Sequence, residues 1–549
     1  MIATCANTLW LAGCMAESAR FHRASRDIAE EQQRLLRAIL AANAETEFGR
    51  LHGFSSIRSY SDYLQRVPLR GYEDYLQWID RAAEGIPNVL TRERIRLFEP
   101  TSGSSGSAKW IPYTQSLQRE FQQGIRAWIA DLFLEYPDLL GGQAYWSVSP
   151  VMAERRTTPG GMPIGFDDDT AYVGGWQRRL VNAVMAVPGD VRLTSDVDAF
   201  RYVTLLYLVR ARNLRLASIW NPSFFSLILE RLPEWGDRLI YDLRQGTHSD
   251  PRRAAEVRHA LLPGTPQDRH VRLWPKLGLI SCWADANAAG PAARLADLFP
   301  QSRIQAKGLI ATEGFVSLPL AGCDGAALAV RSHFFEFLPV DRDGEADSQH
   351  SALADQLDSG QRYSVVLTTG GGLYRYQLKD LVEVTGRWRQ CPLVRFVGRQ
   401  GHVSDWFGEK LNEAHVRGIL ESVFSEFDIA PAFAMLACDN GGAVSTYALY
   451  LETSAPDATL QRAADSMEHR LQENFHYRYA RRLGQLGSLR IFLAKGAAST
   501  YLNACSSRGL RIGDIKPVCL DRGDGWSERF RGRFVEELAA VRSAGIGDS

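Results

Sequence analysis

Residues 98–114 read FEPTSGSSGSAKWIPYT, so hydroxyl side chains, glycines and one lysine are concentrated between two apolar segments. The alternating residues 94–98 predict a β-strand, and residues 109–113 predict the next one. From position 115 onward, apolar side chains recur at helical spacing through Ile125, Trp128 and Leu132. The Ser/Gly segment is therefore predicted to be a loop between two strands, followed by a long amphipathic helix.

This Ser/Gly loop has the composition of an anion-binding turn. Gly103 and Gly106 allow the backbone to turn tightly and to expose its N–H groups, and Lys109 adds a positive charge. Such a loop suits the phosphates of a nucleotide. It is not a Walker A loop, because no Gly-Lys-Ser/Thr follows a glycine at the required spacing. A flexible surface turn is the alternative interpretation.

Two further segments fit a nucleotide site. Residues 307–314 read KGLIATEG, so an apolar run after Lys307 ends in Thr312-Glu313, and a carboxylate there is a natural ligand for Mg²⁺. Three glycines at 370–372 precede a Tyr-rich strand that ends at Asp380, whose carboxylate can accept hydrogen bonds from ribose hydroxyls. The alternatives are a strand that ends in a solvated glutamate and a glycine hairpin with a capping aspartate.

A third segment lies near the C-terminus, where Lys516 follows the glycine-containing residues 508–515. A lysine on such a loop in a small mobile lobe can be delivered into a cleft and withdrawn. The alternative is an ordinary surface lysine, which most lysines are.

Length and composition limit the class of protein. A chain of 549 residues is too long for one ordinary core, so two or more lobes are expected. Lys+Arg and Asp+Glu both number 63, which gives no reason to expect a nucleic-acid partner. The 8 cysteines include no C-x-x-C pair, so a reducing, cytoplasmic location fits best. No apolar run approaches the ~20 residues of a membrane helix, so no membrane association is expected.

The organisation along the chain indicates a mixed α/β protein. A first helix is predicted near the N-terminus, with Leu9, Trp10 and Leu11 as its packing face, although residues 11–14 have the composition of a lipoprotein cleavage box. Helices are predicted over 25–45, 60–85 and 200–245, and short strands over 334–340, 363–368, 381–384 and 394–397. The last ~140 residues form a separate pattern: a hairpin around 440–442, a helix over 457–482 and a strand over 489–493. We therefore expect a large domain, 1–403, and a small mobile α/β domain, 404–549.

Taken in order, these segments resemble the adenylate-forming superfamily. Residues 101–109 are similar to its phosphate loop, with Ala108 where that loop usually has proline, and Gly398-Arg399 is similar to its Gly-Arg before the hinge. The closer resemblance is to the Gretchen Hagen family, the auxin-responsive acyl acid amido synthetases of plants and their bacterial relatives. It extends from about residue 30 to 520. The matching segments are RVPL (66–69), YED (72–74), FEFLP (335–339), YRYQLKD (374–380) and FVGR (396–399).

The resemblance implies a fold with a β-barrel and helix-flanked sheets in the large domain and a C-terminal α/β lid. It also implies an ATP- and Mg²⁺-dependent ligase. The enzyme adenylates a carboxylic acid, releases pyrophosphate, and transfers the acyl group to an amino acid amine. The resemblance assigns the nucleotide site to Thr101, Ser102, Gly103, Ser104, Ser105, Gly106, Leu309, Asp380, Phe396 and Arg399. It assigns the catalytic roles to Lys109, Thr312, Glu313 and Lys516, with Glu313 as the metal ligand.

Two positions depart from the family pattern. Leu309 stands where the family often has an aromatic residue for adenine stacking, and Lys379 stands where plant members have glycine before the ribose-binding aspartate. An acyl-CoA ligase with the same first step, and a non-catalytic binder of the same fold, are the alternative functions. For the acid pocket, residues around 120–240 are the candidates, with Trp128, Trp146 and Phe224 as an apolar wall or as ordinary core.

Overall fold

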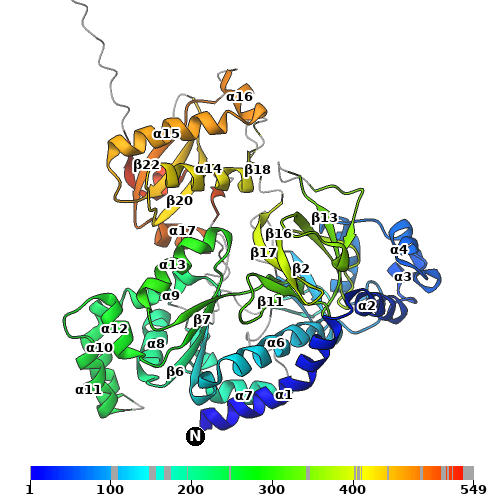
Figure 1. The fold of residues 1–549 in the computed structure, drawn as a ribbon, viewed down its shortest axis with the longest axis horizontal. Helices are drawn as coiled ribbons and strands as arrows, with labels where there is room; N and C mark the ends of the chain where they lie inside the picture. Colours follow the sequence, from blue (N-terminus) through cyan, green and yellow to red (C-terminus); the bar gives the residue numbers. More distant parts are fainter. Residues whose placement is uncertain are drawn as a thin grey trace, which may run out of the picture. The chain divides into compact units, whose positions relative to one another are not determined.

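The computed structural model describes most of the chain (Figure 1). The described residues are 2–100, 109–147, 156–165, 175–194, 196–246, 249–341, 346–400, 403–404, 409, 411–441, 444–482, 486–507, 515, 518–521 and 523–535. Their contacts divide the chain into a large unit, Met1–Gly398 with Cys505–Lys516, and a small unit, Arg399–Ala504 with Pro517–Ser549. Both units combine helices with sheets, which confirms the predicted mixed α/β class. None of the described helices is long and apolar enough to cross a lipid bilayer.

The first core of the large unit lies on a seven-stranded sheet. Its order is β11-β12-β17-β16-β15-β13-β14, and every pairing recorded within it is antiparallel. Its strands are β11 (Ser317–Pro319), β12 (Ala326–Leu328), β13 (Phe334–Pro339), β14 (Ala352–Leu353), β15 (Arg362–Thr368), β16 (Tyr376–Trp388) and β17 (Cys391–Arg399). Helices α1, α6 and α7 pack together beside it (Figure 1). The predicted strands at 381–384 and 394–397 are thus parts of much longer strands.

The second core of the large unit surrounds a sheet of four parallel strands. Its order is β3-β6-β7-β8, and helices α8 to α13 share its hydrophobic core, with α10, α11 and α12 grouped on one side (Figure 1). The strands are β3 (Gln143–Trp146), β6 (Leu214–Ser218), β7 (Leu279–Cys282) and β8 (Arg303–Ala306). Strand β6 interrupts the region predicted to be helical over 200–245, because Leu214 and Leu216 pack inward from a strand instead of a helix.

The remaining elements of the large unit are short strands and the helices themselves. The strands are β1 (Leu97–Pro100), β2 (Trp110–Tyr113), β4 (Arg156–Thr157), β5 (Pro163–Ile164), β9 (Ile310–Ala311) and β10 (Gly314–Phe315). The helices are α1 (Ile2–Ala24), α2 (Ile28–Ala42), α3 (Glu47–Leu51), α4 (Tyr60–Arg66), α5 (Leu76–Ala83), α6 (Gln115–Glu135), α7 (Gly175–Val184), α8 (Val197–Arg210), α9 (Pro222–Leu229), α10 (Leu232–Gln245), α11 (Pro251–Ala260), α12 (Pro266–Leu273) and α13 (Ala289–Leu298).

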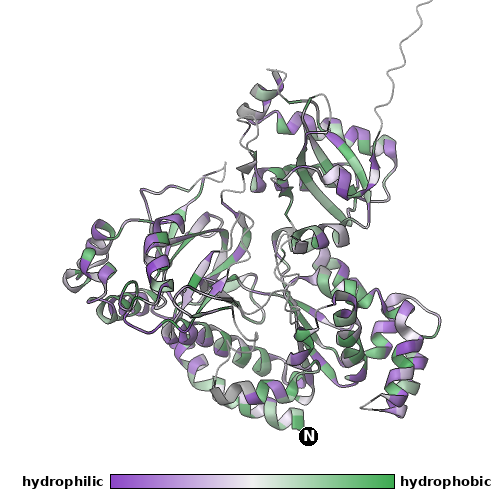
Figure 2. Ribbon diagram, turned by 180° about the vertical axis from the view of Figure 1, so that it is seen from behind, coloured by the Kyte–Doolittle hydropathy of each residue, from purple (hydrophilic) through white to green (hydrophobic). Residues whose placement is uncertain are grey.

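The small unit has its own hydrophobic core around a five-stranded sheet of order β23-β20-β21-β22-β24. The strands of this sheet are β20 (Phe433–Asp439), β21 (Thr446–Glu452), β22 (Arg490–Lys495), β23 (Leu520–Asp521) and β24 (Arg531–Phe534), while β18 (Val403–Ser404) and β19 (Leu411–Asn412) form a separate pair. Its helices are α14 (Glu413–Glu426), α15 (Asp457–Leu471), α16 (Phe475–Arg482), α17 (Ala497–Ser507) and α18 (Trp526–Arg529). Figure 2 shows green, hydrophobic strands in this sheet beneath helices of mixed hydropathy.

Two predictions about helices are corrected. The helix predicted over 457–482 is two helices, because the Asn474 side chain accepts a hydrogen bond from the backbone N–H of Tyr477 (3.0 Å) near the start of α16. In α1, Trp10 is 1% exposed and packs inward as predicted, whereas Leu9 is 55% exposed.

The antiparallel pairing of β1 with β2 confirms that the Ser/Gly segment connects two strands. Strand β1 begins at Leu97, three residues later than predicted. Thr114 follows β2 at once and caps α6, because its hydroxyl accepts a hydrogen bond from Leu117 N–H (3.1 Å). The loop therefore leads into a strand and a helix that are both fixed by their own hydrogen bonds.

Candidate active site

Lys109 lies directly before β2, against the ring of Tyr72. Its Nζ is 5.2 Å from the ring centroid, and the Tyr72 hydroxyl accepts a hydrogen bond from the backbone N–H of Trp110 (2.7 Å). Burial raises the pKa of Tyr72, and the Glu313 carboxylate is one of the charges that raise it further. Tyr72 is therefore close to both Lys109 and Glu313, which are 204 positions apart in the sequence.

The Thr312-Glu313 pair forms the turn between β9 and β10. The carbonyl of Thr312 accepts a hydrogen bond from the Tyr113 hydroxyl (3.0 Å), which ties the turn to the end of β2. Glu313 is 4% exposed, and its Oε1 accepts a hydrogen bond from the Tyr376 hydroxyl at the start of β16 (3.2 Å). The turn is thus held between the strand that follows the Ser/Gly loop and the strand that carries Asp380.

Asp380 is 3% exposed and follows a local irregularity in β16. The register with β15 shifts between Ser364 and Val366, opposite this part of β16, and Lys379 has φ +64°. This is the left-handed region, which costs a residue with a Cβ about 1 kcal/mol or more. Glycine has no such penalty, which explains why glycine suits the position that Lys379 occupies in this chain. Lys379 adopts the same turn at an energetic cost.

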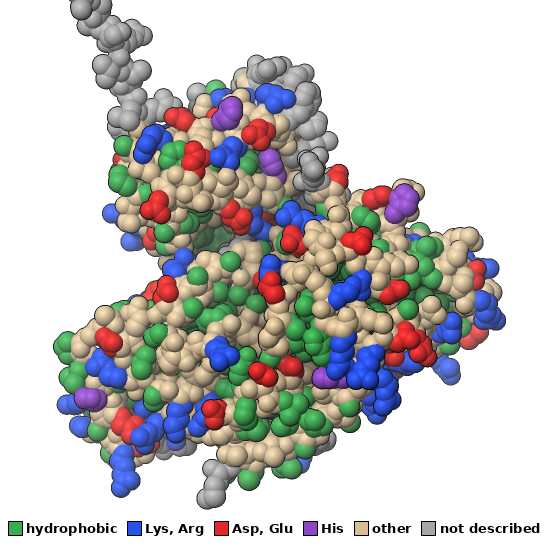
Figure 3. Space-filling model, in the orientation of Figure 1, with side chains coloured by type: hydrophobic (Ala, Val, Ile, Leu, Met, Phe, Trp, Pro, Cys, Tyr) green, Lys and Arg blue, Asp and Glu red, His purple; other side chains and the backbone are tan. Residues whose placement is uncertain are grey.

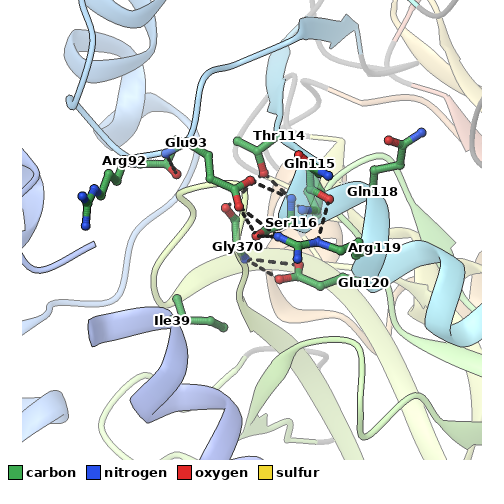
Figure 4. Close-up of polar contacts among 12 residues, drawn as sticks. Ile39, Arg92, Glu93, Thr114, Gln115, Ser116, Gln118, Arg119, Glu120 and Gly370 are labelled. Atoms are coloured by element: carbon green, nitrogen blue, oxygen red, sulfur yellow. Dashed lines mark hydrogen bonds and ion pairs between the residues drawn. The ribbon is translucent and has the colours of Figure 1, made fainter. Parts of the chain in front are cut away.

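The glycine segment before β16 is held by the first turns of α6 (Figure 4). The Thr114 hydroxyl donates to the carbonyl of Gly370 (3.1 Å), and the Gly370 N–H donates to the Glu120 carboxylate (2.9 Å). A Cβ on Gly370 would lie 2.4 Å from Oε1 of Glu120 and 2.7 Å from Cβ of Ser116, so a larger residue would displace the start of α6 from this segment. Beside this contact, Glu93 accepts hydrogen bonds from the backbone and hydroxyl of Ser116 and from Arg119 (Figure 4).

A buried histidine connects the contact between Gly370 and Glu120 to the Thr312-Glu313 turn. Nε2 of His333 accepts a hydrogen bond from the backbone N–H of Phe315 (2.9 Å), which leaves the proton on Nδ1. Nδ1 lies 2.9 Å from Oε2 of Glu120, but the carboxylate is beside the ring N–H direction, so the contact is electrostatic and not an aligned hydrogen bond. The glycine segment, α6 and the hairpin that carries Glu313 therefore form one connected network.

The predicted nucleotide-binding residues Leu309, Phe396 and Arg399 lie in three different parts of the structure. Leu309 is 7% exposed in the first core, and its N–H donates to the Ser317 hydroxyl (2.8 Å). Phe396 is partly buried on β17, and its backbone N–H donates to the carboxylate of Asp285. Arg399 ends β17 and is the first residue of the small unit.

Several predicted residues lie outside the described part of the structure. They are Thr101, Ser102, Gly103, Ser104, Ser105, Gly106 and Lys516. The residue before Lys516 is described: the carbonyl of Ile515 accepts a hydrogen bond from the Asn221 side chain (2.8 Å), and Ile515 is 3% exposed. Asn221 follows β6, so Ile515 lies at the end of the parallel sheet.

Three tyrosines at the centre of this arrangement were not predicted to be site residues. Tyr72, Tyr113 and Tyr376 connect the residue after the Ser/Gly loop, the Thr312-Glu313 turn and β16. Tyr72 and Tyr376 lie in the conspicuous segments YED and YRYQLKD, which was the available signal. Their shared location depends on contacts between distant parts of the chain, and one sequence does not reveal these.

The sequence matches three domain descriptions of one family in the expected order. The GH3 family N-terminal domain matches residues 17–304, the GH3 family central domain residues 326–399, and the GH3 family C-terminal domain residues 424–522. Relatives include a probable indole-3-acetic acid-amido synthetase, GH3.7, of Oryza sativa subsp. japonica, with 26% identity over 95% of this chain and 96% of that protein. The indole-3-acetic acid-amido synthetase GH3.3 of Arabidopsis thaliana is 24% identical over 90% of each chain.

The fold is that of a solved acyl acid amido synthetase. The structure of AtGH3.15 in complex with 2,4-DB superposes with a TM-score of 0.83 and 20% identity, over 96% of this chain and 98% of that one. The chain belongs to the GH3 family. The resemblance to the Gretchen Hagen family drawn from the sequence is therefore confirmed.

Proposed function

We propose that this protein is an ATP-dependent acyl acid amido synthetase, a ligase that joins a small carboxylic acid to the amine of an amino acid. Its membership in the GH3 family, whose relatives above bear the name acid-amido synthetase, supports this activity. The observation that carries the proposal is the arrangement around the three tyrosines. Lys109 contacts the ring of Tyr72, and Glu313 lies near the same tyrosine. The hydroxyl of Tyr376 joins Glu313 to the strand that carries Asp380.

The reaction has two steps. A carboxylate oxygen of the acid bonds to the α-phosphorus of ATP while the bond to the β-phosphate oxygen breaks, so pyrophosphate leaves. The amino acid nitrogen then bonds to the acyl carbon, loses a proton, and AMP leaves with the electrons of the broken carbon–oxygen bond. The protein must gather groups that stabilise negative charge on the phosphates and align the reactants.

The Ser/Gly loop, the lysine that follows it and the Thr312-Glu313 turn fit these needs. Lys109 neutralises phosphate charge together with the N–H and hydroxyl groups of Ser102, Gly103, Ser104, Ser105 and Gly106, while Thr101 shapes the loop. Thr312 lies near the α-phosphate, and Asp380 accepts hydrogen bonds from the ribose. Leu309, Phe396 and Arg399 border the nucleotide, and Lys516 contacts the reacting carboxylate and the α-phosphate.

Glu313 has the properties expected of a protein ligand for Mg²⁺. Mg²⁺ in nucleotide sites takes one or two protein carboxylates and completes its shell with phosphate oxygens and water. Glu313 is a single buried carboxylate, and the described part of the chain holds no cluster of three or more His, Cys, Asp or Glu that could hold a metal by itself. When bound there, Mg²⁺ supplies positive charge to the triphosphate. The tyrosine hydroxyl of Tyr376 orients the carboxylate.

The domain roles and the location follow from the same proposal. Residues 1–403 bind ATP and the acid, and residues 404–549 form a small mobile domain. The substrates are small molecules, with neither nucleic acid nor membrane as a partner; Lys/Arg and Asp/Glu side chains both occur across the face shown in Figure 3. All 8 cysteines are free thiols, and seven of them are at least partly buried, which supports a cytoplasmic location.

A screen of carboxylic acids tests the activity. Acid-dependent exchange of pyrophosphate into ATP is expected for at least one acid. With that acid, a pool of amino acids is expected to drive AMP release, whereas CoA is not. AMP release that depends on CoA alone would identify an acyl-CoA ligase and overturn the amide product.

The Glu313→Gln substitution tests the site. We expect adenylation to fall by about 10²-fold or more, because one electrostatic stabiliser of the transition state is lost. Tyr376→Phe keeps the carboxylate and removes one hydrogen bond, so a loss of about tenfold or less is expected. Both rates are measured by pyrophosphate exchange, and the thermal unfolding midpoint of each variant serves as the folding control. Equal, small effects of both substitutions would contradict the assigned role of Glu313.

A further inference from the structure

A buried lysine lies at the carboxyl end of the parallel sheet, apart from the residues assigned above. Lys307 directly follows β8 and is 8% exposed. Its Nζ donates a hydrogen bond to the hydroxyl of Ser218 at the end of β6 (2.7 Å). The same Nζ lies 5.0 Å from a ring centroid of Trp128 on α6 and 5.1 Å from one of Trp220, which follows β6.

This ammonium group has no carboxylate partner in the described part of the chain. Burial lowers the pKa of Lys307 to about 8, and among the residues that the structure describes the thiol of Cys282 on β7 is the titratable group that acts on it. Burial also raises the pKa of Cys282 to about 12, so the thiol is neutral and provides no counter-charge. A buried cation without an anion is unfavourable, and the two indole faces offset only part of this cost.

The surroundings of Lys307 are aromatic. Trp146, the last residue of β3, stacks on Trp128 with 6.5 Å between ring centroids, and Trp283, just after β7, lies 5.9 Å from Trp220. The buried Nε1 of Trp146 also lacks an acceptor within the part of the chain that the structure describes. In open α/β sheets, ligands bind beyond the carboxyl ends of parallel strands, which is where these residues lie.

Lys307 lies five residues before Thr312, and the two residues contact side chains at different places along the β2–α6 segment. Tyr113, next to the start of α6, contacts Thr312, whereas Trp128, in the second half of α6, contacts Lys307. Five fully extended residues span at most about 18 Å, so this is the upper limit for the distance between the Cα atoms of Lys307 and Thr312. Because both side chains reach toward segment 307–312, a molecule that spans the interval has its reacting group near Thr312 and its other end near Lys307.

We propose that Lys307, with Ser218, is the receptor for a second anionic or hydrogen-bond-accepting group of the acid substrate, at the end opposite the reacting carboxylate. The indoles of Trp128 and Trp220 contact the flat or apolar body between the two ends. The substrate class is thus carboxylic acids that carry a distal carboxylate, phenolate or hydroxyl oxygen. This inference rests on the proposed acyl acid amido synthetase activity.

Matched acids test the proposal by direct binding without ATP. The probes are benzoate with terephthalate and hexanoate with adipate, each pair differing by a distal carboxylate, and the signal is quenching of tryptophan fluorescence. We expect the wild-type protein to bind the diacid of at least one pair about tenfold or more tightly, the value of a charge-assisted hydrogen bond. Lys307→Met, which keeps the stem and removes the charge, is expected to abolish this preference. Lys276→Met, an exposed lysine before β7, is the control and is expected to retain it.

The pH dependence of diacid binding tests the proposal in the wild-type protein, without a variant. Deprotonation of Lys307 above pH 8 removes its charge, so the diacid preference of the wild-type protein is expected to fall between pH 7 and pH 9, while monoacid binding stays constant. A wild-type protein without any diacid preference would overturn the proposal. So would a Lys307→Met variant that weakens both members of a pair equally, since this indicates a purely structural lysine.

Pyrophosphate exchange with the same acids separates this inference from the proposed function. If the diacid preference and its loss in Lys307→Met are found but no acid supports exchange, the binding inference holds and the synthetase activity fails. If monoacids support exchange as well as diacids do, and Lys307→Met leaves this unchanged, the activity holds and the role of Lys307 fails.

Discussion

Lys379 combines a strained backbone with an exposed side chain, one residue before Asp380. Lys379→Gly removes the penalty of a left-handed residue with a Cβ, which is larger than the added chain entropy of glycine. We expect a gain of about 1 kcal/mol in the free energy of unfolding, measured by urea denaturation of the large unit. Lys379→Ala keeps the Cβ and is expected to show no gain. An equal gain in both variants would indicate a side-chain effect instead of backbone strain.

Asp285 carries a pH-dependent contribution to stability. Burial raises its pKa from the usual 3.8 to about 6, although the Arg395 guanidinium and the N–H of Phe396 act in the opposite direction. Between pH 4 and pH 6 the folded protein therefore binds more protons at this site than the unfolded chain does. This contribution to stability is lost as the pH rises from about 4 to about 6.

The Asp285→Asn variant isolates that contribution, because an amide oxygen still accepts the hydrogen bond from Phe396 and carries no charge. The variant is expected to melt at a higher temperature than the wild-type protein at pH 7, with the difference shrinking to zero near pH 4. Thermal unfolding across this pH range provides the measurement. A difference that stays constant with pH would show that Asp285 is not the titrating group.

At the scale of elements, α6 is the helix on which the site is organised. Its first turns hold Gly370, and its middle receives Phe315, the residue two positions after Glu313. A Cβ on Gly124 would lie 2.3 Å from the ring of Phe315, so the missing side chain lets the β9–β10 hairpin approach the helix. The position of Glu313 thus depends on a glycine in another element.

Two helical glycines make a matched test of this contact. Gly124→Ala forces Phe315 to move, so a loss of about 1–3 kcal/mol in the free energy of unfolding and reduced adenylation are expected. Gly418→Ala, in α14, meets no atom within 4 Å and is expected to stabilise by up to about 1 kcal/mol. Urea denaturation and pyrophosphate exchange provide both readouts. Stabilisation by Gly124→Ala would mean that the hairpin can shift without cost.

Sequence patterns predicted the elements whose signal is local. Helix α6 begins at the predicted Gln115, and β13 and β15 start within one residue of their predicted positions, because period and capping lie in contiguous residues. Strand β6 was missed because its leucines lie in a leucine-rich region of helical spacing. The break at Asn474 was missed because only the side-chain cap, and no proline or glycine, interrupts the pattern.

The site residues, like the helices and strands, divide into those with a local sequence signal and those without one. The Thr312-Glu313 turn and Asp380 are recognisable as short segments that end apolar runs. Tyr72, Tyr113 and Lys307 are not, because their roles depend on partners far along the chain: Glu313, Thr312 and Trp128. The roles assigned to all of these site residues, as well as to the loop 101–106 and to Lys516, remain predictions.

At the scale of the whole molecule, the chain connects its two units more than once. Contacts place Arg399–Ala504 in the small unit, return Cys505–Lys516 to the large unit, and place Pro517–Ser549 in the small unit again. Within the large unit, the Asn221 side chain donates to the carbonyl of Ile515. Ile515, which precedes Lys516 in the sequence, is therefore attached by a hydrogen bond to the residue Asn221 that follows β6.

This attachment predicts that the two half-reactions depend differently on the segment. Lys516→Ala is expected to reduce acid-dependent pyrophosphate exchange by about 10²-fold or more, because a charge that stabilises the transition state is lost. Asn221→Ala leaves the lysine in place but releases its neighbour, so a smaller loss of about tenfold is expected. Amide formation from a synthetic acyl adenylate and an amino acid bypasses adenylation and is expected to change little in either variant. Lys495→Ala, an exposed lysine on β22, is the control. Undiminished exchange in Lys516→Ala would remove this residue from the mechanism, and equal losses in both half-reactions would show that the segment supports the fold and not adenylation.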